Sequence, residues 1–180
     1  MELRGYSDEY GVLVAEWAVD AKEVALLSGR VEYPFPEELK TSWRKVDPDI
    51  RSYLLFDGDR PVGYGEVWLD DEEDEVELAR IIVDPKVRGR GIGLDLLRAL
   101  LVPAVDSGYS DVFLRVRPEN AVAIRTYHRT GFVDVPAALM DEWNQGQPID
   151  YHWMRYAGEP TWPAEQVPPR EQVGADELRG

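Results

Sequence analysis

Hydrophobic and polar residues alternate through much of the chain, and this period-two pattern is typical of strands that turn one face to a core. The clearest case is residues 53–56 and 62–69, which flank a turn sequence at 57–61 and predict a hairpin. The same pattern predicts further strands at residues 2–6, 76–83, 111–116, 132–135 and 150–156.

One long helix is expected after the central strands. Leu94, Leu97 and Leu101 follow one another at spacings of three and four, which predicts a helix over residues 93–105. Pro103 lacks a backbone N–H, so it should kink the last turn of this helix or end the helix early.

Other helices are expected on either side. The N-terminal third is predicted to be mostly helical after its first strand, with the best pattern at residues 36–46. A later helix should begin near Asn120, a suitable N-cap, and run to residue 129, before Gly131 as a C-terminal cap.

Together these elements predict an α/β (α+β) fold. Strands that alternate with helices, next to an antiparallel hairpin, favour a mixed sheet with helices on both faces. The length of 180 residues suits one domain, and we find no internal repeat. We place the domain at residues 1–157, because prolines are dense in residues 158–180 and predict an extended or disordered tail.

The charge of the chain limits its partners. It holds 35 acidic and 20 basic residues, and the net charge of −15 repels a nucleic-acid backbone and favours a basic partner. No apolar stretch approaches the length of a membrane span, and the N-terminus lacks the pattern of a signal peptide. We therefore expect a soluble, cytoplasmic protein that binds neither nucleic acid nor membrane.

Cysteine and histidine chemistry is restricted. The absence of cysteine excludes disulfides, thiolate metal sites and a cysteine nucleophile. His128 and His152 are far apart in the sequence and lack ligand spacing with acids, so we expect no metal site and interpret both as structural.

The most informative segment is residues 81–94, where an apolar strand leads through Asp84-Pro85 into a glycine-spaced helix start. Glycine lets the backbone approach a ligand closely, and a helix N-terminus offers N–H groups and partial positive charge to an anion. Lys86, Arg88 and Arg90 reverse the sign of an otherwise acidic chain. This combination predicts a phosphate-binding site.

Two familiar phosphate loops do not match this segment. The chain has no Gly-Lys-Ser/Thr, as a P-loop requires, and no Gly-x-Gly-x-x-Gly. The segment does contain Arg-x-x-Gly-x-Gly at residues 88–93. In this it resembles the GNAT superfamily of acetyl-CoA-dependent N-acetyltransferases. Five residues downstream fit the family's second pattern: Asn120, Ala123, Tyr127, Gly131 and Phe132. Together the matching segments span about residues 76–135.

The resemblance implies a mostly antiparallel sheet of six to seven strands, splayed at its centre to hold acetyl-CoA (coenzyme A). It assigns the pantetheine arm to the strand residues Ile81, Ile82 and Val83. It assigns the pyrophosphate to Arg88, Gly89, Arg90, Gly91, Ile92 and Gly93. Asn120 and Tyr127, two helical turns apart, share a face that can meet the cofactor. Asn120 as a helix cap alone is the other interpretation.

Acetyl transfer to an amine needs a base, because an alkylammonium with a pKa near ~10 is mostly protonated at neutral pH. The resemblance places this base at Glu77, whose pKa must be raised by burial or by neighbouring acids, with Glu66 on the preceding strand as the competitor. Tyr127, at the family's position, is the candidate acid that protonates the departing thiolate.

The acceptor is expected to be a cationic amine, since the acids between residues 70 and 77 would attract it and Trp68 would touch it. A solvated loop is the alternative reading of these acids. In the family the acceptor is set by segments that correspond here to residues 21–46 and 136–148. A homodimer is also possible, in which the proline-rich tail folds over the neighbouring subunit.

Two functions other than the enzyme stay open at this point. The first is a non-catalytic acyl-CoA sensor that keeps the same fold. The second is an acidic interaction protein that binds basic partners through residues 70–77, with residues 88–93 an ordinary tight turn between a strand and a helix.

Overall fold

The computed structural model describes residues 1–28, 32–37, 40, 43 and 46–158, and in these residues the chain forms one seven-stranded sheet. The strand order is β1-β2-β3-β4-β5-β7-β6. The strands are β1 (Glu2–Gly5), β2 (Ile50–Asp57), β3 (Arg60–Asp70), β4 (Glu75–Val83), β5 (Asp111–Val116), β6 (Phe132–Asp134) and β7 (His152–Tyr156). All neighbours are antiparallel except β4 and β5, which are parallel. The mixed sheet that the sequence predicted, and the mostly antiparallel pairing that the resemblance implied, are thus confirmed.

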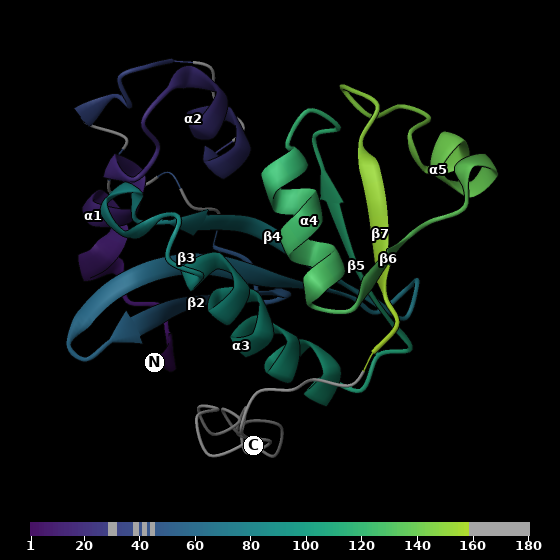
Figure 1. The fold of residues 1–180 in the computed structure, drawn as a ribbon, viewed down its shortest axis with the longest axis horizontal. Helices are drawn as coiled ribbons and strands as arrows, with labels where there is room; N and C mark the ends of the chain where they lie inside the picture. The colour runs from purple at the N-terminus through teal and green to yellow at the C-terminus, as the bar shows by residue number, and fades with distance from the viewer. Residues whose placement is uncertain (29–31, 38–39, 41–42, 44–45, 159–180) are drawn as a thin grey trace, which may run out of the picture.

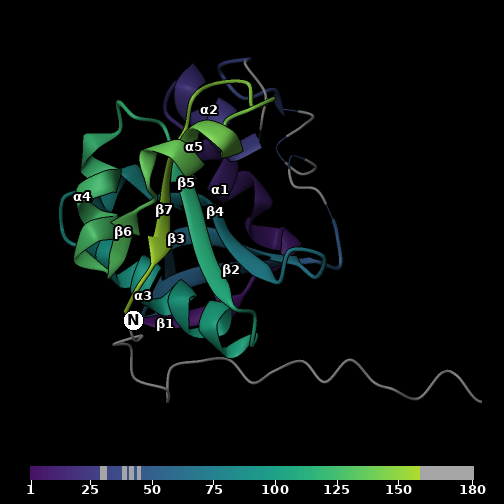
Figure 2. The same ribbon diagram turned by 90° about the vertical axis from the view of Figure 1, so that its right-hand side faces the viewer.

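The helices are distributed over both faces of this sheet (Figures 1 and 2). They are α1 (Gly11–Glu16), α2 (Ala21–Ser28), α3 (Ile92–Asp106), α4 (Ala121–Arg129) and α5 (Ala137–Trp143). Helices α3 and α4 cover one face, and α1 and α2 cover the other over β2–β4. In the described part of the chain no helix is long and apolar enough to cross a membrane.

Two hydrophobic cores follow from the alternation of side chains along the central strands. On one face, Leu96 and Leu100 of α3 pack against Val67 of β3 and Leu78 of β4. On the other face, α1 and α2 pack against residues of β2 and β3, among them Tyr64. Each core holds its own set of helices on the sheet, because burying apolar surface is the main favourable term in folding.

Close packing of α3 on the sheet depends on small residues in β3. A Cβ atom built on Gly65 would lie 2.5 Å from Leu100 Cδ1, well inside van der Waals contact. Leu100 is fully buried, so its side chain has little room to move away. Gly65 therefore lets the long helix lie directly on the strand that precedes β4.

Of the two outcomes expected for Pro103, an early end does not occur, because α3 runs past it to Asp106. Pro103 lies in the last turn and is buried against the core. There it removes a single backbone donor, and the end of the helix tightens, with Ser107 N donating to Ala104 O and Gly108 N donating to Val105 O. The apolar contacts of the last turn outweigh one lost hydrogen bond.

Two other expected segments differ from the structure or lie beyond it. Residues 136–148, where no helix was predicted, include the short helix α5, and Pro136 is its N-cap. The helix predicted at residues 36–46 falls partly outside the described residues. The predicted tail, apart from Gly158, also lies outside them.

Candidate active site

The two central strands, β4 and β5, separate after a short stretch of pairing. Their register covers three residue pairs, from Glu75↔Asp111 to Glu77↔Phe113. Beyond Glu77, β4 continues to Val83 without pairing to β5. The strands therefore form a V that opens toward the start of α3, as the resemblance implied.

The closed end of the V is fastened by contacts outside the ladder. Ser110 N donates to Asp74 O over 3.1 Å, and the Ser110 hydroxyl contacts the Asp74 carboxylate. The Tyr109 hydroxyl donates to Asp71 in the turn between β3 and β4. These contacts hold the entry to β5 against the turn that leads into β4.

A β-bulge lies in the arm of the V formed by β4. Tyr64 pairs with Ile82 while Glu66 pairs with Ala79, so β4 has one residue more than β3 between these pairs. Arg80 absorbs the extra residue with a φ of 49°, in the left-handed region that non-glycine residues seldom adopt. After the bulge, Ile82 packs into the core under α1 and α2.

The segment between β4 and α3 turns sharply. Asp84 begins it, accepting a hydrogen bond from Lys86 N over 2.9 Å and pairing with Arg60 at 2.5 Å. Burial opposes ionisation of Asp84, but these two contacts outweigh it and lower the pKa of its carboxyl. Asp84 thus stays an anion that fixes the first turn after the strand.

Two glycines with positive φ complete the turn. Gly89 has a φ of 77° and Gly91, the N-cap of α3, a φ of 87°. A Cβ atom built on either residue would meet nothing within 4 Å, so the backbone here borders open space. The first N–H groups of α3 have no acceptor within the helix, which makes this open corner suitable for an anion.

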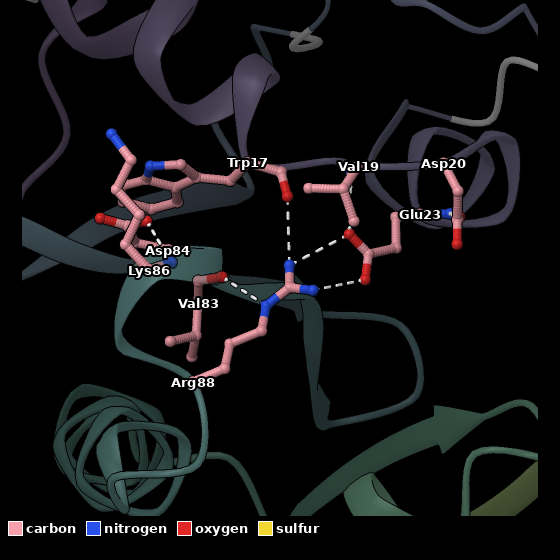
Figure 3. A network of polar contacts seen from close by, with 8 residues as sticks. All are labelled: Trp17, Val19, Asp20, Glu23, Val83, Asp84, Lys86 and Arg88. Atoms are coloured by element: carbon pink, nitrogen blue, oxygen red, sulfur yellow. Dashed lines mark hydrogen bonds and ion pairs between the residues drawn. The ribbon is translucent and has the colours of Figure 1, made fainter.

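Arg88 lies in this corner, but its side chain is held by protein groups (Figure 3). Its Nε donates to Val83 O over 3.0 Å, its Nη1 to Glu23 Oε1 over 2.7 Å, and its Nη2 to Glu23 Oε2 over 3.0 Å and Trp17 O over 3.1 Å. The guanidinium thus uses four of its five N–H donors within the chain. Lys86 and Arg90, like Arg88, are exposed cations of the corner.

Helix α4 begins close after the end of β5 and carries two predicted residues. Asn120 caps it, with Oδ1 accepting from Ala123 N over 3.2 Å, so the capping role is confirmed. Tyr127 is buried beside Phe132, with ring centroids 6.1 Å apart. Burial raises the pKa of the Tyr127 phenol to about 12, so the group holds its proton throughout the neutral range.

The two predicted base candidates lie on adjacent strands with different surroundings. Glu66 is fully buried, and its carboxylate accepts hydrogen bonds from the Tyr64 hydroxyl and from Trp68 Nε1 at 2.6 Å. Arg80 Nη1 lies 3.4 Å from Glu66 Oε1. The central carbon of the same guanidinium lies 5.4 Å from the centre of the Trp68 ring. Every oxygen of Glu66 therefore has a donor.

Glu77 stands where the pairing of β4 and β5 ends. Its register partners are Trp68 on β3 and Phe113 on β5. Its carboxylate pairs with Arg115 Nε over 2.9 Å. Burial raises the pKa of Glu77 more than Arg115 lowers it, and Glu75 adds to the rise. The carboxyl thus gains affinity for a proton at the vertex of the V.

The sequence did not single out Arg115, which links Glu77 to the aromatic residues under α5. Its guanidinium lies 5.4 Å from the Tyr151 ring and 5.3 Å from the Trp153 ring. Trp143 of α5 in turn packs edge-on against Trp153, with centroids 5.3 Å apart. A charged residue inside the apolar strand β5 is the signal that would have drawn attention to Arg115.

Among the described residues, no group of three or more histidines, cysteines and acids is placed to hold a metal ion. His128 and His152 both contact Asp134 Oδ1, at 3.4 and 2.7 Å, where α4, β6 and β7 meet. These contacts fit the structural role predicted for the histidines.

The splayed sheet and the glycine-rich corner at the head of α3 define the class of fold, an α/β fold with an open cleft in a mixed sheet, and comparison with known proteins gives the family. Residues 13–132 match the acetyltransferase (GNAT) family, and the chain belongs to it. Two relatives are a mycothiol acetyltransferase of Gordonia bronchialis, 35% identical over 98 residues, and an IAA acetyltransferase of Azospirillum brasilense, 33% identical over 87 residues.

These relatives match only in part. The aligned segments cover 53% and 48% of this chain, and 31% and 57% of the respective relatives, so the chain spans about a third to just over half of their length.

Among solved structures, the PaiA N-acetyltransferase of Thermoplasma acidophilum in complex with coenzyme A shares the fold with a TM-score of 0.63 at 19% identity, over 87% of this chain and 98% of that one. A mutant spermidine N-acetyltransferase SpeG of Vibrio cholerae gives 0.66 at 20%, over 87% and 94%.

Proposed function

We propose that the protein is an N-acetyltransferase that transfers the acetyl group of acetyl-CoA to a primary amine. The observation that carries the proposal is the open, glycine-lined corner at the head of α3, next to the mouth of the V between β4 and β5. Membership of the acetyltransferase family supports it, as does the coenzyme A bound by a protein of the same fold.

The backbone of the site fits the two parts of the cofactor. Along Ile81, Ile82 and Val83, β4 has no pairing with β5, so its edge can accept the amides of a pantetheine arm as it would another strand. The amides of Gly89 to Gly93 would hold the pyrophosphate, with Lys86 and Arg90 supplying positive charge nearby. A Cβ at Gly91 would occupy the space that this proposal gives to the ligand.

Acetyl-CoA supplies the activated acetyl group as a thioester. Glu77 takes a proton from the ammonium of the acceptor, directly or through water, so that the nitrogen lone pair can attack the acetyl carbon. Its raised pKa, due to burial, suits this role better than the fully bonded Glu66. Tyr127 would donate a proton to the departing sulfur, which its pKa of about 12 permits at neutral pH, and the second proton lost by the amine nitrogen would return to the phenolate.

The acceptor proposed here is a cationic amine that approaches the face of the sheet carrying Trp68 and Glu77. The acids of the β3–β4 turn and Glu75 give this end of the sheet a negative field. One protein of the same fold is named for acetylation of spermidine, a polyamine, which makes polyamines the first compounds to test. The lack of cysteine fits a reducing cytoplasm as the place of action.

One observation favours a second candidate, a sensor that binds acyl-CoA without turnover. Both candidate bases are paired with arginines, Glu66 with Arg80 and Glu77 with Arg115. A carboxylate held by a guanidinium is a weaker base than a free one. In the sensor these pairs would only balance buried charge.

Incubation with acetyl-CoA and a panel of primary amines tests the enzyme directly. We expect release of coenzyme A thiol in the presence of polyamines, at a rate that depends on amine concentration. The chain has no cysteine, so a thiol reagent reports the coenzyme alone. A rise in melting temperature on adding coenzyme A, with no thiol release for any amine, would establish the sensor in place of the enzyme.

Substitution Gly91→Val tests the cofactor corner. It should raise the Kd of coenzyme A by about tenfold or more, measured by titration calorimetry, because a branched side chain would fill the space above the backbone. Gly108→Val is the matched control: Gly108 has the same φ of 87° and equally open surroundings, at the other end of α3. Equal coenzyme affinity in the two variants would contradict the assignment.

Substitution Glu77→Gln tests the base. In the wild type, kcat/KM should fall as the pH decreases through the pKa of Glu77, which burial places above its usual 4.5. The variant should lose this acidic limb and about 10²-fold or more of the rate. Glu66→Gln is the comparison, and a larger loss in that variant would move the role of base to Glu66.

Substitution Tyr127→Phe tests the acid. The phenylalanine ring fills the same buried site, so the Kd of coenzyme A should stay close to that of the wild type. The turnover number should fall by about tenfold or more, because the departing sulfur loses its proton donor. Steady-state kinetics beside calorimetry separates the two effects, and an unaltered turnover number would remove Tyr127 from the mechanism.

A further inference from the structure

The side chain of Arg88 joins two parts of the molecule that are far apart in sequence. Arg88 lies in the corner between β4 and α3, and its guanidinium binds the junction of α1 and α2, where Glu23 precedes it by 65 residues (Figure 3). Glu23 receives it with both oxygens, at 2.7 and 3.0 Å, which is the two-point pairing that makes arginine–carboxylate contacts strong and directional. Trp17 O adds a third contact from the end of α1.

Glu23 is itself held in place at the start of α2. Its Oε2 accepts from Val19 N over 3.0 Å, and its own N–H donates to Asp20 Oδ1 over 2.8 Å. The carboxylate is therefore fixed by the backbone of the α1–α2 junction before Arg88 reaches it. A pair between two such anchored groups loses little side-chain entropy and transmits displacement from one side to the other.

The helices on the far side of this pair cover the face where the acceptor is proposed to bind. Trp17 and Leu27 belong to the same core as Tyr64, whose hydroxyl contacts Glu66. Helix α2 also reaches the opposite arm of the V, where Lys22 Nζ lies 3.2 Å from the Glu119 carboxylate, next to Asn120. The α1–α2 segment thus touches the segments that follow both β4 and β5.

We propose that Arg88 is a positioning residue that couples occupation of the cofactor corner to the order of the α1–α2 segment. The inference rests on the proposed function, since it takes coenzyme A as the ligand of the corner. With four donors engaged inside the chain, the guanidinium serves α1–α2 and leaves the pyrophosphate to the backbone amides. A ligand that holds the corner then also holds the α1–α2 junction, and by linkage an acceptor that orders α1–α2 tightens the binding of coenzyme A.

Hydrogen–deuterium exchange with and without coenzyme A tests this coupling in the full chain. In the wild type, coenzyme A should slow exchange both in the corner, residues 86–95, and in residues 17–28. In Glu23→Gln the corner should keep its protection, while the coenzyme-dependent protection of 17–28 falls by about fivefold or more. Arg88→Gln should behave the same way, because glutamine lacks the guanidinium that pairs with both oxygens of Glu23.

The readout is the difference that coenzyme A makes, because a merely loosened structure exchanges faster with and without the ligand. Glu2→Gln is the matched control: it removes a carboxylate paired with an arginine at 2.6 Å on β1, and it should leave both protections unchanged. Protection of the corner without protection of 17–28 in the wild type would overturn the coupling alone. Absence of protection at the corner would overturn the proposed function as well. Full protection of 17–28 in Glu23→Gln, or loss of corner protection in Arg88→Gln, would overturn the role given to Arg88.

Discussion

The structure depends on how briefly β4 and β5 pair. Parallel neighbours in most sheets continue side by side, but here the ladder ends at Glu77 and Phe113. Because the strands then separate, the backbone of β4 up to Val83 has an edge in the middle of the sheet. An edge of this kind is normally covered or blocked, since unpaired backbone groups invite another strand. The proposed pantetheine arm would satisfy the same groups, so the break in pairing and the binding site are one feature.

Burial of charge is the second constraint on the site. Glu66 is fully buried, and removing one partner from a buried ion pair typically costs about 3–5 kcal/mol. Arg80 can reach Glu66 because the bulge in β4 turns its backbone into the left-handed region. The bulge therefore both re-aims β4 toward the mouth of the V and supplies the charge that Glu66 requires.

Much of the fold and part of the site could be predicted from the sequence. The strands could be predicted because their alternating or apolar runs are bounded by turn residues, and Gly91 was singled out by the glycine spacing at the start of α3. The partner of Arg88 could not be found, because Glu23 lies in a distant helix whose only signal is an ordinary acidic first turn. Helix α5 was missed because it spans seven residues and has no buried residue to give it an apolar period. Arg115 was missed because a charged side chain in a strand shows its acidic partner only once the register is known.

Tyr109 and Ser110 hold the narrow end of the divergent strand pair against the β3–β4 turn, while at the other end the described strands β4 and β5 do not pair and the segments that follow them both contact α2. Two strands that pair only at one end can rotate relative to each other about that end. A slight rotation of this kind gives almost no displacement beside Glu77 and the largest displacement at the tips. The reacting groups would thus stand near the pivot, where geometry is stiffest, while the tips give way as a long, flexible ligand enters or leaves.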